Sequence, residues 1–313
     1  MFSLVQLEYL VAVDTWRHFA LAAEKCFVTQ PTLSMQLKKM ETDLDIVLFD
    51  RSKQPVVPTL AGEKLISQAR HILRERNKFD SLVNELKGQI NGTLRLGIIP
   101  SLAPFLLPLF IGAFLKKYPD IQLIINELLS NQIIDALKHD TIDAAILVTP
   151  LHQPELKEIP LFTEGILLYI SPDHELSKLP EITFSNLDKH DIWLLGTGHC
   201  FRNQVINLCS LQQKRVRSLN IEYESGSLET LIKLVDKYGG LTLIPELMVM
   251  NLTEEQKENV RYFTDELPLR EVSMVVNRIF AKEKIISLLN AEVKSSIPFD
   301  MLNFNRGKVV EWI

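Results

Sequence analysis

The stretch HFALAAEKCFVTQPTLSMQLKKMETDL, residues 18–44, decides the fold of the first part of this 313-residue chain. An Ala-rich helix over His18–Cys26 is followed by a turn. Thr29 then suits an N-cap, with Pro31 near the first helical position of the next helix. In that next helix apolar residues recur at spacings of 4, 3 and 4 and predict one buried stripe, made of Leu33, Leu37, Met40 and Leu44. Two helices joined by a tight turn are typical of a helix-turn-helix.

The residues around this stretch suit contact with DNA. A first helix is expected around Leu7–Val13, and two short strands within Leu48–Val57 predict a wing. Short polar and basic side chains on the outer faces suit a DNA groove. The candidate DNA contacts are Thr29, Gln30, Pro31, Thr32, Ser34, Gln36, Lys38 and Arg51. A small helical bundle with solvated charges stays open as the alternative interpretation of this pattern.

Residues 59–88 predict one long helix that ends at Gly88. Its seam repeats at alternating spacings of four and three, as in a coiled coil, through Leu65, Ala69, Ile72, Arg76, Phe79, Val83 and Leu86. A coiled-coil linker indicates a dimer, and a dimer of winged helices reads a two-fold-related DNA site. A helix that packs on its own domain is the less favoured alternative.

From Leu94 onward the pattern alternates between strand and helix, which predicts an open α/β sheet in two lobes with a cleft between them. The expected strands are Leu94–Ile99, Ile121–Leu128, Ile142–Val148, Ile166–Ile170, Ile192–Leu195, Leu219–Tyr223, Leu241–Ile244 and Val272–Val276. The expected helices are Pro104–Lys117, Asn131–His139, a helix after Cys200, Ser227–Tyr238 and Glu283–Val293.

Composition excludes several classes of protein. The net charge is -5, and residues 1–58 hold 6 basic against 7 acidic residues, so DNA binding must come from the placement of charge. The start of the chain has no signal-peptide pattern, and the longest apolar run, Leu102–Leu115, is too short to span a membrane. We therefore expect a cytoplasmic protein without membrane contact. No metal cluster, phosphate loop or hydrolase triad is evident, so we expect no cofactor, no metal and no enzyme.

Two of the three cysteines, Cys200 and Cys209, lie nine positions apart in a segment without Gly or Pro that predicts a helix. In a helix their Cα atoms are separated by a rise of about 13.5 Å, whereas a disulfide requires roughly 4.4–6.8 Å. The pair can bond only if the helix unfolds. His199 and Arg202 flank Cys200 and are expected to favour its thiolate. The pattern therefore predicts a redox switch.

The chain resembles the LysR-type transcriptional regulators over its whole length. The resemblance rests on FALAAE (19–24), TQPTLS (29–34), LFDR (48–51) and TLAG (59–62). Within that family, IIPS (98–101), PFLLP (104–108), GHC (198–200), Cys209, SLETL (227–231) and LIP (243–245) resemble the OxyR-like hydrogen-peroxide sensors. The resemblance implies an α/β fold: a winged helix-turn-helix over 1–58, a dimerising linker helix over 59–88, and a two-lobed sensor like periplasmic binding proteins over 91–313. Its lobes are expected at 91–162 with 268–313, and at 163–267.

The resemblance also implies residue roles and partners. Cys200 is then the peroxidatic cysteine, and Cys209 resolves its sulfenic acid to a disulfide. The peroxide pocket is expected to hold Ser101, Ser130, His199, Arg202, Asn203 and Arg278. Ser stands at 101 and 130 where the family commonly has Thr, and Asn203 where it commonly has Asp. The implied partners are promoter DNA, RNA polymerase, hydrogen peroxide as the signal, a thiol reductant such as a glutaredoxin or thioredoxin, and further copies of the chain in a homodimer or homotetramer.

Three other functions remain open on the sequence. A metabolite-responsive LysR-type regulator would bind a ligand in the cleft, and its cysteines would be incidental. A thiol peroxidase on a two-lobed domain would turn over repeatedly with a reductant, but it leaves residues 1–58 without a purpose. A periplasmic-type binding protein conflicts with the missing signal peptide. The last residues, Phe304–Ile313, have no assigned role.

Overall fold

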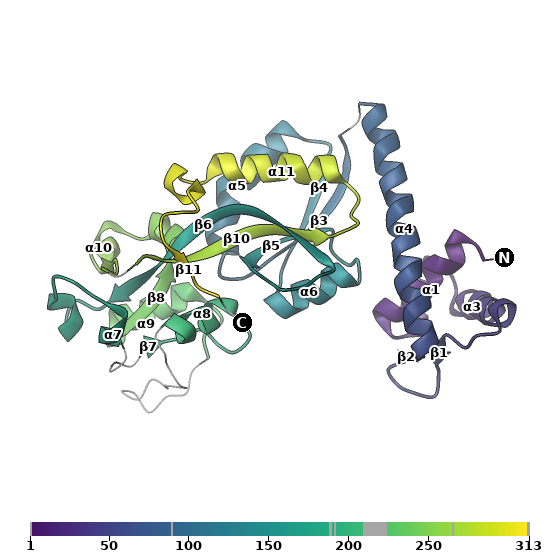
Figure 1. Cartoon of the computed structure of the whole chain (residues 1–313), viewed down its shortest axis with the longest axis horizontal. Helices are drawn as coiled ribbons and strands as arrows, with labels where there is room; N and C mark the ends of the chain where they lie inside the picture. Colours follow the sequence, from purple (N-terminus) through teal and green to yellow (C-terminus); the bar gives the residue numbers. More distant parts are fainter. Residues whose placement is uncertain are drawn as a thin grey trace. The chain divides into compact units, whose positions relative to one another are not determined.

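The computed structural model describes residues 2–88, 90–187, 190, 192–208, 224–264 and 266–311. Cys209 and the expected strand Leu219–Tyr223 lie outside the described residues. The chain divides into two compact units, residues 1–89 with 279–282, and residues 90–278 with 283–313. Each unit is treated by itself below, with the element labels of Figure 1.

The first unit is a winged helix-turn-helix, as predicted. Helices α1 (Leu4–Trp16), α2 (Phe19–Lys25) and α3 (Gln30–Leu44) surround a core that includes Leu10, Leu33 and Leu37. The Thr29 hydroxyl accepts a hydrogen bond from the backbone N–H of Thr32 and so caps α3. The wing is an antiparallel pair, β1 (Phe49–Asp50) with β2 (Val57–Pro58).

Helix α4 (Leu60–Leu86) is the predicted long helix, and its two halves differ in burial. Ile66 and Ala69 of its first half belong to the core of the winged unit. Arg70 there pairs with Asp14 of α1 at 2.8 Å. Phe79, Leu82 and Leu86 of the second half are exposed. The first half of α4 therefore packs on its own unit, as the alternative interpretation expects, and the second half presents Phe79, Leu82 and Leu86 at its surface.

The second unit is built on one mixed sheet with strand order β4-β3-β5-β10-β6-β8-β7. Its strands are β3 (Gly92–Ile98), β4 (Ile121–Glu127), β5 (Ala144–Thr149), β6 (Leu156–Ile170), β7 (Ile192–Trp193), β8 (Leu241–Pro245), β9 (Val260–Arg261), β10 (Pro268–Asn277) and β11 (Lys308–Val309). The first half of β6 pairs with β10, and Ile166–Ile170 pairs with β8. Strand β6 thus runs from one lobe into the other (Figure 1).

Helices cover this sheet in the manner of an α/β fold (Figure 1). They are α5 (Ala103–Lys117), α6 (Ser130–Lys138), α7 (Phe184–Leu187), α8 (Cys200–Leu208), α9 (Leu228–Tyr238), α10 (Glu254–Lys257) and α11 (Glu283–Ser296). Short 3-10 turns add η1 (Glu175–Lys178), η2 (Glu246–Asn251) and η3 (Phe299–Leu302). The predicted fold class is confirmed, and the expected helices and strands that fall on described residues are present, whereas α7, α10, β9, β11 and the 3-10 turns were not predicted. Strands β6 and β10 are longer than the expected Ile166–Ile170 and Val272–Val276.

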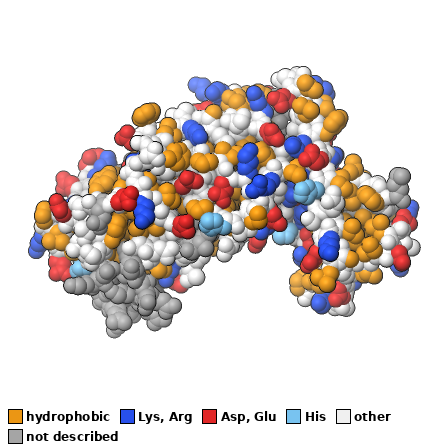
Figure 2. All heavy atoms as spheres, viewed as in Figure 1, with side chains coloured by type: hydrophobic (Ala, Val, Ile, Leu, Met, Phe, Trp, Pro, Cys, Tyr) orange, Lys and Arg blue, Asp and Glu red, His pale blue; other side chains and the backbone are white. Residues whose placement is uncertain are grey.

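Two further properties concern membrane crossing and surface charge. Among the described residues, no helix combines the length and apolar character that a membrane crossing needs. Figure 2 shows Lys and Arg side chains interspersed with Asp and Glu over the described residues on the face drawn, in keeping with the net charge of -5.

Candidate functional site

Cys200 is the first residue of α8, and its thiol is free and buried, with 3% of the residue exposed. The chain approaches it through Gly198, whose φ of +94° suits glycine. A Cβ at this position would meet Leu129, next to Ser130, at 3.1 Å. The backbone before α8 therefore lies tightly against the start of α6.

Burial dominates the electrostatics of the thiol. Desolvation raises the pKa of Cys200, and the Arg270 charge is the largest influence that opposes it. The Ser130 hydroxyl and the backbone N–H groups of Phe201 and Cys200 also lower this pKa by stabilising the thiolate. These N–H groups lie at the N-terminus of α8, which the sequence expects to favour the thiolate. The cation that lowers this pKa is Arg270, and the contributions expected of His199 and Arg202 stay predictions.

Arg270, near the start of β10, is the central cation of this site and is fully buried. Its guanidinium donates to the Ser101 hydroxyl at 3.0 Å and to the Ser101 carbonyl at 3.1 Å. It also lies over the ring of Phe201 in α8, 5.0 Å from the ring centroid. Arg270 therefore joins the β3–α5 connection, where Ser101 lies, to the cysteine helix.

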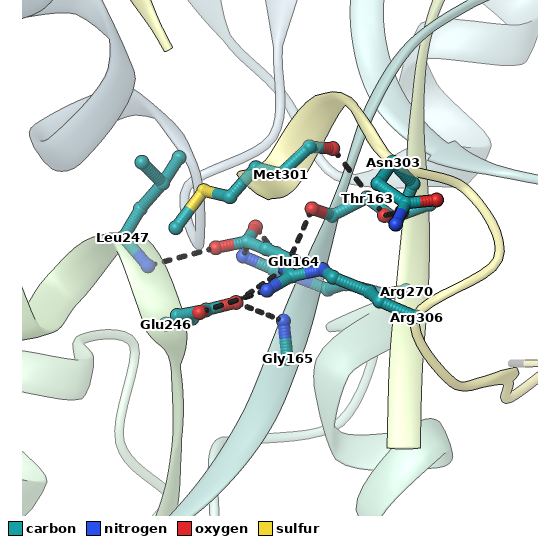
Figure 3. Close-up of polar contacts among 9 residues, drawn as sticks. All are labelled: Thr163, Glu164, Gly165, Glu246, Leu247, Arg270, Met301, Asn303 and Arg306. Atoms are coloured by element: carbon teal, nitrogen blue, oxygen red, sulfur yellow. Dashed lines mark hydrogen bonds and ion pairs between the residues drawn. The ribbon is translucent and has the colours of Figure 1, made fainter. Parts of the chain in front are cut away.

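A buried carboxylate balances this cation, as Figure 3 shows. Glu164 of β6 is fully buried and pairs with Arg270 at 2.6 Å. Its second oxygen accepts from the backbone N–H of Leu247 at 3.1 Å. Burial raises the pKa of Glu164, while Arg270 and the Leu247 N–H oppose that rise. Because both partners are desolvated, removal of either one leaves an uncompensated charge in the interior.

Ser101 and Ser130 are both buried near the carboxyl ends of the neighbouring parallel strands β3 and β4. In open α/β sheets this end of the strands is where ligands bind. Ser101 is bonded to Arg270. The Ser130 hydroxyl has no hydrogen-bond partner of regular geometry among the described residues. Since it stabilises the Cys200 thiolate, it is a polar group available at the sulfur.

The other predicted pocket residues are placed differently. Desolvation lowers the pKa of His199, which favours its neutral ring. Arg202 donates to the Leu195 carbonyl at 2.7 Å, and Asn203 is exposed on α8. Arg278 is exposed beyond the far end of β10, where it donates to the Pro154 carbonyl. The assignment of Arg278 to the pocket is wrong, because eight residues of extended strand place it about 26 Å from Arg270.

Sequence reasoning missed Arg270 and Glu164. Each is a charged residue within a buried stretch of its strand. The sequence signal that could have found them is a charged residue within a run that should be buried, since a buried charge needs a partner. The two residues are 106 positions apart, and the sequence does not pair them.

Cys209, the predicted disulfide partner of Cys200, lies outside the described residues, yet α8 limits how close to Cys200 it can come. The eight steps from Cys200 to Leu208 rise about 12 Å along the helix. Consecutive Cα atoms are about 3.8 Å apart, so Cys209 stays more than roughly 8 Å from Cys200 while α8 is intact. A disulfide needs roughly 4.4–6.8 Å. The described helix therefore has to unwind before such a bond can form.

The candidate DNA-binding residues lie on α3 and the wing. Thr29, Gln30, Pro31 and Lys38 are exposed, and Thr32, Ser34 and Gln36 are partly buried. Several of the candidate side chains already have partners, and the Thr29 and Thr32 hydroxyls are hydrogen-bonded to each other at 2.8 Å. The Gln36 side chain accepts from Gln6 at 3.3 Å, and Arg51 pairs with Glu41 at 2.7 Å. Among the candidates, Lys38 offers an exposed cation at the end of a long side chain.

Two family models match the chain. The bacterial regulatory helix-turn-helix protein model of the lysR family matches residues 4–63, and the LysR substrate binding domain matches residues 87–280. The chain belongs to the LysR family. It is therefore a DNA-binding transcriptional regulator and not an enzyme.

Individual relatives narrow the comparison within the LysR family. The hydrogen peroxide-inducible genes activator of Haemophilus influenzae is 33% identical over 92% of this chain and 96% of its own length. The DNA-binding transcriptional dual regulator OxyR of Escherichia coli is 33% identical over 82% of each chain. Among solved structures, a full-length OxyR variant from Pseudomonas aeruginosa is 30% identical, with a TM-score of 0.77 over 94% of this chain and 98% of that one. This LysR-family chain is thus OxyR-like in sequence and in structure.

Proposed function

We propose that this regulator senses hydrogen peroxide through Cys200 and controls oxidative-stress defence genes. The observation that carries the proposal is the environment of Cys200, a buried thiol at a helix N-terminus, with the Arg270 charge and the Ser130 hydroxyl acting on its thiolate. The relatives named for a peroxide response support it. A thiol that served only as a small core residue would need no cation and no buried hydroxyl around it.

In the proposed reaction the Cys200 thiolate attacks one oxygen of hydrogen peroxide. The O–O bond breaks, a sulfenic acid forms, and the leaving hydroxide takes a proton to become water. The Cys209 thiolate then attacks the Cys200 sulfur, the S–O bond breaks, and the leaving hydroxide takes a proton to become a second water as the disulfide forms. Arg270 and the N–H groups of Cys200 and Phe201 stabilise the attacking anion, and Ser130 orients the peroxide.

The signal then passes from α8 to DNA. Residues 59–88 act as a dimerising linker, and the exposed Phe79, Leu82 and Leu86 of α4 supply its apolar contact. The change in α8 alters how the sensors, residues 91–313, associate in a tetramer, and thereby the spacing of the domains formed by residues 1–58 on promoter DNA. The proposed lobes are residues 91–162 with 268–313, and residues 163–267. Contacts with RNA polymerase then activate transcription. A glutaredoxin- or thioredoxin-like reductant reduces the Cys200–Cys209 disulfide back to the thiols. The protein acts in the cytoplasm.

Non-reducing peptide mapping after one equivalent of peroxide, timed over seconds, tests the proposal. We expect a fast Cys200–Cys209 linkage that is absent in Cys200→Ser, with Cys26 left as a thiol. Cys26 is the matched internal control, because burial raises its pKa as well and it has no comparable stabilising cation. Oxidation of Cys26 as fast as Cys200 would contradict the proposal and favour a metabolite ligand for the regulator.

A further inference from the structure

The C-terminal residues Asn303–Glu311, here called the strap, are tied to the two long strands of the sensor. The Asn303 carbonyl accepts from the Thr163 hydroxyl of β6 at 3.3 Å. Arg306 donates to the Thr163 carbonyl at 2.8 Å and pairs with Glu246, which also accepts from the Gly165 N–H (Figure 3). These contacts lie directly beside the buried Glu164–Arg270 pair.

Further along, the strap forms a strand next to Arg270. Strand β11 pairs in parallel with the start of β10, through Lys308 opposite Pro268 and Val309 opposite Leu269. The Val310 N–H donates to the Leu269 carbonyl at 2.8 Å. The next residue of β10 is Arg270, which lies over Phe201 of α8. The strap is therefore fixed to the same strand that holds the start of the cysteine helix.

The end of the strap also bonds α8 directly. The Gln204 side-chain amide donates to the Val310 carbonyl at 2.8 Å, and the Asn207 amide donates to the Glu311 carbonyl at 3.0 Å. Residues 204 and 207 are three apart and lie on one face of the helix. Gln204 is fully buried, and a buried amide is costly without a hydrogen-bond partner. Its partner at the amide nitrogen is the strap.

We propose that the strap holds α8 in its helical, thiol form, and that unwinding of α8 releases the strap. The proposal that the strap holds α8 rests on the contacts described above. The proposal that the strap is released rests on the proposed peroxide switch. In that switch the disulfide requires α8 to unwind, which breaks the hydrogen bonds from Gln204 and Asn207 to the strap. Strap release is then a second output of oxidation, at the edge of β10.

Hydrogen exchange of the reduced full-length protein tests the hold on α8 without any redox step. Gly307→Ala displaces the strap, since a Cβ at Gly307 would lie 2.2 Å from the Leu267 carbonyl oxygen. Gly112→Ala in α5 is the matched control, because a Cβ there meets nothing within 4 Å. Loss of one net hydrogen bond raises the equilibrium constant for local opening of α8 about fivefold, and loss of two raises it about thirtyfold. We expect amide exchange within residues 201–208 to rise about thirtyfold in Gly307→Ala and to stay unchanged in the control.

Asn207→Asp provides a second variant in case Gly307→Ala does not fold. It replaces the donor amide by a carboxylate at an exposed position, so folding is preserved while one bond is lost. We expect up to about a fivefold rise in exchange of the same peptide. Unchanged exchange of residues 201–208 in the folded variants would overturn the hold of the strap on α8.

The release is tested on the wild-type protein, reduced and after one equivalent of peroxide, with Cys200→Ser as the control. We expect the amides of Lys308 and Val310 to lose protection on oxidation in the wild type only. If the Cys200–Cys209 bond forms and these amides keep their protection, the strap release is wrong and the peroxide switch stands. If no such bond forms, the peroxide switch and the release both fail, whereas the exchange of the reduced variants still decides the hold.

Discussion

Arg270→Met separates the structural role of the buried ion pair from its role at the thiol. Arg270 and Glu164 are both 0% exposed and pair at 2.6 Å. Loss of one member of such a pair costs about 3–5 kcal/mol of unfolding free energy, because the other charge stays buried without compensation. Arg270 is also the largest influence that lowers the pKa of Cys200. We expect the single variant to lose stability and to react with peroxide about tenfold more slowly, the effect of removing one nearby opposite charge.

The double variant Arg270→Met with Glu164→Gln makes this prediction specific. The Gln side chain keeps an oxygen acceptor for the Leu247 N–H but carries no charge. The double variant should therefore recover most of the lost stability, since no unpaired charge remains in the interior. It should stay slow with peroxide, since the cation beside Cys200 is still missing.

Two assays on the reduced protein decide the question. Urea unfolding followed by tryptophan fluorescence gives the stability, and stopped-flow peroxide consumption in single-turnover conditions gives the rate. Arg270→Lys is the matched control, because it keeps the charge without the fixed fork of the guanidinium. A double variant that recovers both stability and rate would refute the reasoning, since Arg270 would then act on Cys200 only through the fold.

Three further predictions follow. Ser130→Ala should slow peroxide oxidation of Cys200, as measured by stopped flow, because the hydroxyl stabilises the thiolate. Its free energy of unfolding in urea should stay within about 0.5 kcal/mol of the wild type, because the hydroxyl has no regular hydrogen-bond partner among the described residues. Because burial raises the pKa of Cys200, the reduced protein should lose stability as pH rises from about 8.5, where the unfolded thiol ionises before the folded one. Urea unfolding of Cys200→Ser should show a smaller loss, with the part due to Cys26 left in place. Lys38→Ala should reduce the salt slope of operator binding by about one, as measured by fluorescence anisotropy, and an unchanged slope would exclude a phosphate contact.

Local pattern predicted most of the fold, because the helices and strands carry clear apolar periods. The cap at Thr29 and the buried stripe through Leu33 and Leu37 lie where the sequence places them. The long strands were underestimated, because β6 contains Pro160 and Glu164, and β10 begins with Pro268 and contains Arg270. Proline and buried charge both argue against a strand in pattern reasoning.

The candidate site was predicted only as far as its local residues. Cys200, Ser101 and Ser130 are recognisable from short motifs, and the structure buries all three. The cation at the thiol depends on a strand far away in the sequence, so Arg278 was chosen where Arg270 lies. Long-range pairing between buried charges follows from the fold, and one sequence carries no direct signal for it.

The burial of Cys200 limits which oxidants can reach it. With 3% of the residue exposed, the sulfur leaves little room for the in-line approach of a bulky disulfide, whereas hydrogen peroxide has only two heavy atoms. Bulky thiol reagents are therefore sterically excluded from the sulfur. In the proposed switch, opening of α8 on oxidation removes this restriction, so a protein-sized reductant would reach the sulfur in the disulfide form. In that proposal α8 restricts access to the sulfur in the thiol form and permits it in the disulfide form.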